Sequence, residues 1–151
     1  MSTKNRLGLK ILKSSLVVPV RFSETDAMGV VWHGNYLKFF EDAREKFGKE
    51  FGIEYLDMYR NGYFTPIVKS EINHKASIFY GEEAQVNITL EKHDAAKIIF
   101  QYEVINLANN AIAAIGMTMQ VFMNAEDRSL ELIKPSFYAE WEEQQEWLDS
   151  E

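Results

Sequence analysis

The chain has 151 residues, a formal net charge of −7, no cysteine and a hydrophobic share of 46%. A single domain with a core of ordinary size is therefore expected, while disulfide frameworks, thiolate metal sites and a cysteine nucleophile are excluded. The acidic balance, 16 basic against 23 acidic residues, disfavours nucleic acid as a main partner.

Residues 1–13 are interpreted as a basic N-terminal arm. Its basic residues precede an apolar stretch too short for a signal peptide, so a cytoplasmic protein is expected. Residues 16–22 are rich in β-branched side chains and predict a strand, in which Pro19 favours an edge position or a bulge. A polar turn over residues 23–29 follows.

Residues 36–51 predict the clearest helix of the chain. Apolar side chains recur there at spacings of three and four residues, and this stripe must be buried. Asn35 is placed to cap the start of the helix, and Gly52 is placed to end it. On the polar face, Glu41 and Arg44 are predicted to form a surface pair, with catalysis by Glu41 as the alternative.

After a short helix at about residues 54–60, the apolar pattern becomes alternating and predicts four more strands. Their approximate ranges are 64–75, 84–91, 97–106 and 111–123. Residues 135–148 predict an acidic terminal helix. This order indicates an α+β fold. One helix cannot cover both faces of a five-stranded sheet, so the sheet is expected to wrap around the helix and to pair with another subunit.

The segment between the first strand and the long helix is the strongest candidate site. It combines an acid, a histidine, an amide and two glycines beside a helix N-terminus. Unpaired N–H groups there suit a developing oxyanion, and a carboxylate can act as nucleophile or general base. The alternative is that the acid is an ordinary turn residue. These residues are Asp26, Gly29, His33, Gly34 and Asn35.

The spacing of the histidines does not predict a metal site. His74 and His93 lie in strand-like stretches and receive no role, and His33 lacks partners at metal-ligand spacing. The sequence contains no phosphate-binding loop, no serine elbow and no dinucleotide fingerprint. The helix start therefore remains the candidate site.

The run from Phe22 to Arg44 resembles the signature of hotdog-fold acyl-CoA thioesterases of the 4-hydroxybenzoyl-CoA thioesterase and YbgC-like type. The strand order after the helix extends the resemblance over most of residues 14–124. It implies a long central helix wrapped by a five-stranded antiparallel sheet, in subunits that pair to continue the sheet and assemble into a homotetramer. The hotdog domain is then expected over residues 14–134, with an acidic helix in residues 135–151 packed on it.

The resemblance also implies hydrolysis of an acyl-CoA thioester to a free acid and CoA, without metal or cofactor. It places the catalytic carboxylate on Asp26 and the oxyanion-binding amides on His33 and Gly34. Asn35 and Tyr36 match positions that begin the helix and shape the acyl pocket. Whether the carboxylate attacks the thioester or positions water is left open.

Since the chain is acidic, local cations must hold the phosphates of CoA, and Lys69, Lys75 or the basic arm is expected to do so. His33 stands where some hydroxybenzoyl-type relatives carry Tyr, which points to the YbgC-like branch. A dehydratase or hydratase for enoyl thioesters is one alternative, although such enzymes resemble a pattern with closer Asp-to-His spacing. A non-catalytic acyl-thioester-binding homologue is another.

Overall fold

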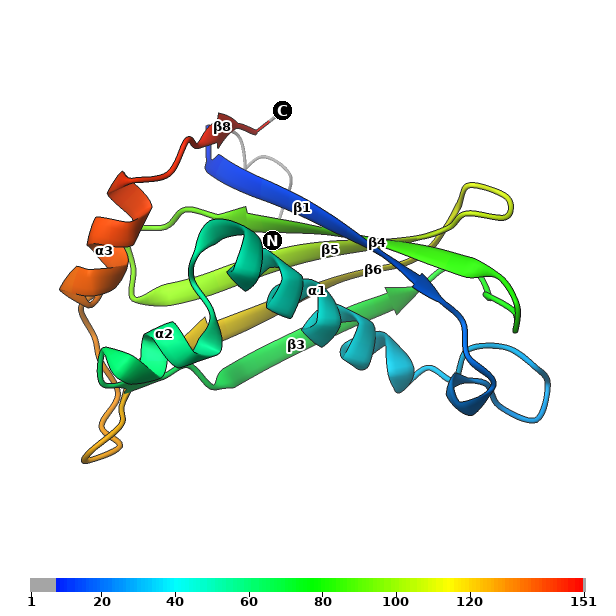
Figure 1. The fold of residues 1–151 in the computed structure, drawn as a ribbon, viewed down its shortest axis with the longest axis horizontal. Coiled ribbons are helices and arrows are strands. Elements are labelled where there is room, and N and C mark those ends of the chain that lie inside the picture. The colour runs from blue at the N-terminus through cyan, green and yellow to red at the C-terminus, as the bar shows by residue number, and fades with distance from the viewer. Residues whose placement is uncertain (1–7, 151) are drawn as a thin grey trace.

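The computed structural model describes residues 8–150, which form a curved antiparallel sheet with a long helix across one face (Figure 1). The strands are β1 (Lys10–Pro19), β2 (Tyr63–Phe64), β3 (Ile67–His74), β4 (Glu83–Glu91), β5 (Lys97–Asn106), β6 (Ala111–Val121), β7 (Met123–Asn124) and β8 (Leu148–Asp149). The helices are a 3-10 turn (Phe22–Glu24), α1 (Asn35–Phe51), α2 (Tyr55–Arg60) and α3 (Ser136–Glu143).

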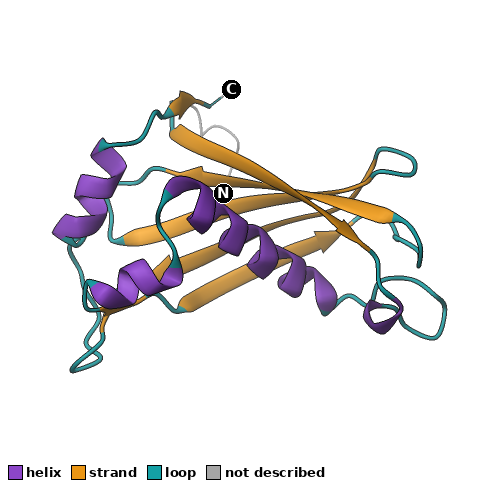
Figure 2. Cartoon of the chain, in the orientation of Figure 1, coloured by secondary structure: helices purple, strands orange, loops and turns teal. Residues whose placement is uncertain are grey.

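The main sheet has six strands in the order β3-β6-β5-β4-β1-β8, and a separate ribbon pairs β2 with β7. Figure 2 shows α1 lying along one face of the sheet, with α2 and α3 towards one end. This is the hotdog arrangement, and it confirms the predicted α+β class. Within residues 8–150 no helix is long and apolar enough to cross a membrane.

The apolar stripe of α1 faces the sheet, as its spacing predicts. Phe40 is fully buried and stacks on Tyr102 of β5, with ring centroids 4.0 Å apart. Gly116 of β6 lies opposite Tyr102 in the register, and a Cβ built on it would be 2.6 Å from the Phe40 ring. The helix therefore approaches the sheet at a point where only glycine leaves enough space.

The capping residue predicted from the sequence is correct at the C-terminal end of α1 and wrong at its N-terminal end. Gly52 ends the helix in the left-handed conformation, with a φ of 70°, as predicted. Asn35 is not the cap: it is the first helical residue, and Gly34 occupies the cap position without a side-chain hydrogen bond. The Asn35 side-chain amide instead donates to the carbonyl of Glu24 in the 3-10 turn.

The first strand begins earlier than the sequence indicates. Lys10 to Lys13, interpreted as part of the arm, belong to β1, and Ile11 lies opposite Glu91 of β4. Ile11 and Leu12 are buried between the two exposed lysines, which hide the apolar pattern. The strand also ends at Pro19, so Phe22 lies in the 3-10 turn rather than in the strand. The rest of the predicted arm, residues 1–7, lies outside the described residues.

Two predicted strands are each divided, and the predicted terminal helix is shorter. Pro66, which has no N–H to donate, separates β2 from β3, and β7 is split from β6 at Phe122. The last helix ends at Glu143, and Leu148 pairs with β1 as part of β8. This short strand is the sixth of the main sheet, where the sequence predicts five.

One edge of the sheet is open in the described chain. β3 pairs with β6 on one side only, and nearly all of its residues are exposed. Its apolar residues Ile67 and Val68 are 43% and 57% exposed. An exposed apolar edge strand offers unpaired N–H and C=O groups to a further strand.

Candidate active site

A short closed loop joins the 3-10 turn to α1 and carries most of the candidate site residues. A bridge between Thr25 and Val31 ties the loop to itself. Gly29 lies within the loop at a φ of +79°, a conformation that residues with a Cβ rarely adopt. Its N–H donates to the Asp26 carbonyl at 3.0 Å. Gly29 therefore shapes the turn that holds Asp26.

The half-buried Asp26 carboxylate is oriented by the backbone of this loop. Its Oδ1 accepts hydrogen bonds from the N–H groups of Met28 at 2.8 Å and Val30 at 3.4 Å. Within residues 8–150, no hydrogen bond reaches the other oxygen, Oδ2. The loop thus fixes the direction of the carboxylate and leaves one oxygen available as a nucleophile or base.

Of the backbone N–H groups at the start of α1, some have a hydrogen-bond acceptor and others do not. Those of Asn35 and Tyr36 donate to the carbonyls of Trp32, at 2.9 Å, and His33, at 3.3 Å. Those of His33 and Gly34 have no acceptor in the described part of the chain. Unpaired N–H groups at a helix N-terminus carry partial positive charge and can bind a negatively charged oxygen.

Gly34 is also required by the packing of its neighbour. A Cβ built on Gly34 would lie 2.1 Å from the indole ring of Trp32. The ring is half exposed and lies 4.8 Å from the His33 ring, centroid to centroid. The space at Gly34 is therefore filled, in this structure, by an aromatic side chain of the same loop.

Glu24 is a site residue that the sequence analysis missed. Its carboxylate is buried and accepts hydrogen bonds from the Arg21 N–H at 2.8 Å and from Lys38 Nζ at 3.0 Å. Its carbonyl accepts from the Trp32 N–H at 2.9 Å and from the Asn35 amide at 2.8 Å. Glu24 therefore clamps the loop to the start of α1. The sequence around Glu24 did not predict this role, because an acidic residue in a polar turn normally faces solvent.

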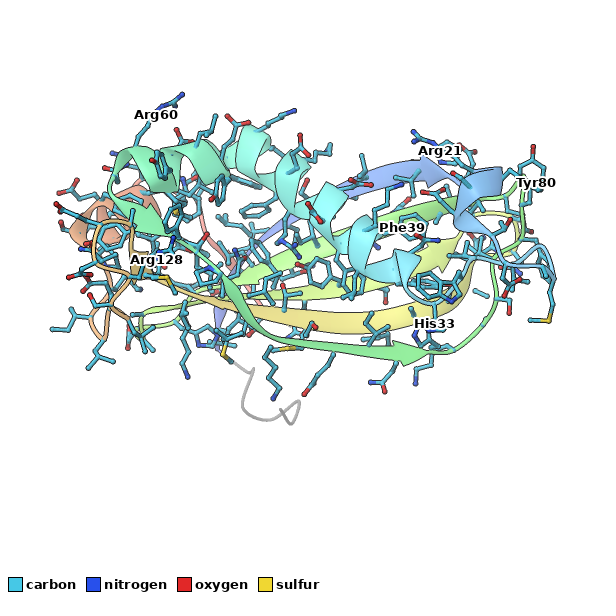
Figure 3. The ribbon with its side chains drawn as sticks, turned by 90° about the horizontal axis from the view of Figure 1, so that it is seen from below. Arg21, His33, Phe39, Arg60, Tyr80 and Arg128 are labelled. Atoms are coloured by element: carbon cyan, nitrogen blue, oxygen red, sulfur yellow. The ribbon has the colours of Figure 1, made fainter. Side chains whose placement is uncertain are left out.

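His74 is a second residue without a predicted role that reaches this site. It ends β3, and its ring lies 5.1 Å from Tyr36 and 6.4 Å from His33 in edge-to-face contacts. Burial raises the pKa of the Tyr36 hydroxyl, so this group stays neutral. Figure 3 shows His33 at the end of the molecule that also carries Tyr80. The β3 end thus forms an aromatic wall beside the helix start.

The two candidate lysines lie far apart, since Lys69 is in the first half of β3 and Lys75 follows the end of this strand. Lys69 pairs with Glu71 at 3.1 Å, and both side chains are exposed. Lys75 directly follows His74 and has no ion pair within residues 8–150. At about 3.3 Å per residue of strand, the two lysines are separated by roughly 20 Å. Only Lys75 lies next to the residues at the start of α1.

Glu41 and Arg44 do not form the predicted surface pair. Arg44 Nη1 donates to the Tyr102 hydroxyl at 2.9 Å, so the side chain turns towards the sheet rather than along the helix. No ion pair joins Arg44 to Glu41 among the described residues. Both residues instead line a cavity of about 470 Å³ between α1, α2 and the sheet.

Comparison with known proteins adds the following relationships. A model of the thioesterase-like superfamily matches residues 20–148. The "Putative acyl-CoA thioesterase YneP" of Bacillus subtilis (strain 168) is 37% identical over 91 residues, which are 60% of this chain and 66% of that protein. A 1,4-dihydroxy-2-naphthoyl-CoA hydrolase of Thermosynechococcus vestitus is 27% identical over 62% of this chain and 65% of that protein. The match spans slightly less than two thirds of either relative.

A solved structure gives a similar result over a longer range. The DHNA-CoA thioesterase from Staphylococcus aureus superposes with a TM-score of 0.77 at 30% identity. The superposition covers 87% of this chain and 87% of that chain.

Proposed function

This chain belongs to the thioesterase-like superfamily, and from that membership we propose that it hydrolyses acyl-CoA thioesters to a free acid and CoA. One observation carries the proposal: the same closed loop holds the Asp26 carboxylate, which keeps one free oxygen, and leads directly to the unpaired N–H groups of His33 and Gly34. Relatives named for acyl-CoA and 1,4-dihydroxy-2-naphthoyl-CoA hydrolysis support it.

In this mechanism the thioester carbonyl oxygen accepts hydrogen bonds from the amides of His33 and Gly34. Asp26 either attacks the carbonyl carbon, forming a mixed anhydride that water then hydrolyses, or removes a proton from the water that attacks. Both routes break the C–S bond and release CoA as a thiolate. One oxyanion donor typically lowers the barrier by about 3 kcal/mol, so this pair supplies a substantial share of the rate.

Release of CoA thiol from a panel of aliphatic and aryl acyl-CoA thioesters tests the proposal. We expect the purified protein to release thiol from at least one of them with the free acid as the second product. Hydration of an enoyl-CoA without thiol release would show the dehydratase alternative instead. Saturable binding of acyl-CoA without any thiol release, in folded protein, would show the non-catalytic alternative.

The open edge of β3 supports a homodimer, with the two copies of this strand pairing to continue the sheet. We expect a mass of twice 17.5 kDa or a higher multiple, such as the homotetramer, in solution. Replacing the exposed Val68 by Glu should raise the dimer dissociation constant about tenfold or more, because it places a charge in the apolar part of the paired edge. Sedimentation against protein concentration measures this shift.

Val17→Glu is the matched control for the dimer. Val17 is 48% exposed on β1, beyond the residues that β8 covers. The Val17→Glu substitution should leave the mass of the assembly in solution unchanged if the two copies pair through β3. Dissociation by Val17→Glu, with a normal Val68→Glu dimer, would move the interface to the other edge.

The position of Lys75 next to His74 supports a contact with a phosphate of CoA. We expect Lys75→Ala to raise KM roughly 5-fold and to leave kcat nearly unchanged, because the phosphates are bound equally in the ground and transition states. Steady-state kinetics with one acyl-CoA measures the two constants. Lys69→Ala, which removes the partner of Glu71, is the control and should change neither. An equal loss in kcat and kcat/KM for Lys75→Ala would contradict the assignment.

A further inference from the structure

The cavity between α1, α2 and the sheet lies in the second half of α1, away from the Asp26 loop. Its volume of about 470 Å³ falls in the usual range for small-molecule sites, roughly 300–1,000 Å³. Apolar side chains form most of its wall, among them Phe47, Leu90, Ile98 and Phe100. Such a wall suits the hydrocarbon part of an acyl group.

One cationic group interrupts this apolar wall. Arg44 lines the cavity and is held from the sheet side, because its Nη1 donates to the Tyr102 hydroxyl at 2.9 Å. The Tyr102 hydroxyl in turn shares a hydrogen bond of 2.7 Å with Thr118 Oγ1. Tyr102 and Thr118 are both buried, and Phe40 stacks on the Tyr102 ring. The guanidinium is therefore held in place before any ligand binds.

Most of the donors of Arg44 remain unused. A guanidinium carries five N–H groups, and within residues 8–150 its single protein acceptor is the Tyr102 hydroxyl. A partly buried cation with free donors favours a ligand that brings an oxygen to it. Resting on the thioesterase function, we infer that Arg44 selects acyl groups with a neutral hydrogen-bond-accepting oxygen, such as a hydroxyl, at the end remote from the thioester.

The charges around the cavity decide between a neutral oxygen and a carboxylate. Glu41 and Glu45 line the same cavity and are exposed at its rim, and Glu54 lines it as well. Of these acids, Glu45 is paired with Lys49 at 3.3 Å. The rim is thus acidic overall and disfavours an anionic acyl group.

Arg44 lies far along α1 from the catalytic loop of its own chain. Arg44 follows His33 by 11 residues, which corresponds to about 16 Å of helix at 1.5 Å per residue. Ile67 lines the cavity and begins β3, so two copies that pair through β3 bring the partner subunit close to the cavity. The acyl group then runs from the catalytic loop of one subunit to Arg44 of the other.

Matched substrate pairs test this selection. Thiol release is measured for hexanoyl-, octanoyl- and decanoyl-CoA and for their ω-hydroxy and ω-carboxy counterparts. At the favoured length, the wild type should prefer the ω-hydroxy over the plain substrate about 10-fold or more in kcat/KM, the effect of one hydrogen bond to a charged group. Arg44→Met should reduce this preference to near unity.

Each other outcome has a separate meaning. An equal loss for both substrates in Arg44→Met would give the residue a merely structural role and overturn the inference. The inference would also be overturned if the wild type showed no preference for the ω-hydroxy substrate or favoured the ω-carboxy substrate. In either case the thioesterase function stands. No thiol release from any substrate would overturn the proposed function as well. Arg60→Met is the control, because Arg60 pairs with Asp57 outside the cavity.

Discussion

Asp26→Asn should lower kcat for thiol release by about 100- to 10,000-fold, the range of a lost general base or nucleophile. The asparagine side chain keeps an oxygen that can accept the hydrogen bonds from Met28 and Val30, so the loop should keep its shape. It lacks the charge needed to attack the thioester or to activate water. KM should change little, since the carboxylate acts in the transition state. Steady-state kinetics with the best acyl-CoA measures both constants.

Asp127→Asn is the control for this prediction. Asp127 is also a turn carboxylate that accepts a backbone N–H, that of Ser129 at 2.9 Å, but it lies on a remote loop. The two variants should have the same thermal midpoint within error, and only Asp26→Asn should lose activity. If both variants kept full activity, Asp26 would be an ordinary turn residue and the catalytic carboxylate would have to be sought elsewhere.

The sequence predicted the parts of the fold that depend on local patterns. The stripe of α1 and the left-handed Gly52 follow from spacing and from the conformational freedom of glycine, and both are present. β5 has the predicted bounds, and from Phe100 to Asn106 its residues alternate between buried and half-buried. The start of β1 was missed, since two lysines flank its buried pair Ile11 and Leu12.

Contacts between distant residues account for what the sequence did not predict. The buried carboxylate of Glu24 pairs with Lys38, which lies 14 residues away in the sequence. Arg44 was assigned to the helix surface, and its bond to Tyr102 spans 58 residues. His74 approaches Tyr36 because β3 ends beside the start of α1. Periodicity shows which face of an element is apolar, but it does not show which polar groups meet across elements.

Gly116→Ala tests the packing that holds this arrangement together. In an open strand, alanine would be favoured over glycine by roughly 0.5–1 kcal/mol. Here the added Cβ would lie 2.6 Å from the fully buried Phe40 ring and 2.8 Å from the Glu71 carbonyl oxygen. The overlap outweighs the propensity, and we expect the free energy of unfolding to fall by about 2–3 kcal/mol. Urea unfolding followed by circular dichroism measures it.

The Phe40 contact can be separated from the backbone contact by a double-mutant cycle with Phe40→Leu. The smaller, flexible leucine should make room for the Cβ, so the cost of Gly116→Ala should be smaller in that background, with a coupling of about 1 kcal/mol. A cost that is the same in both backgrounds would assign the strain to the Glu71 carbonyl alone. An unchanged or increased stability of the single variant would show that the helix can move away from the sheet. In that case the stack of Phe40 on Tyr102 would no longer hold Arg44 in place.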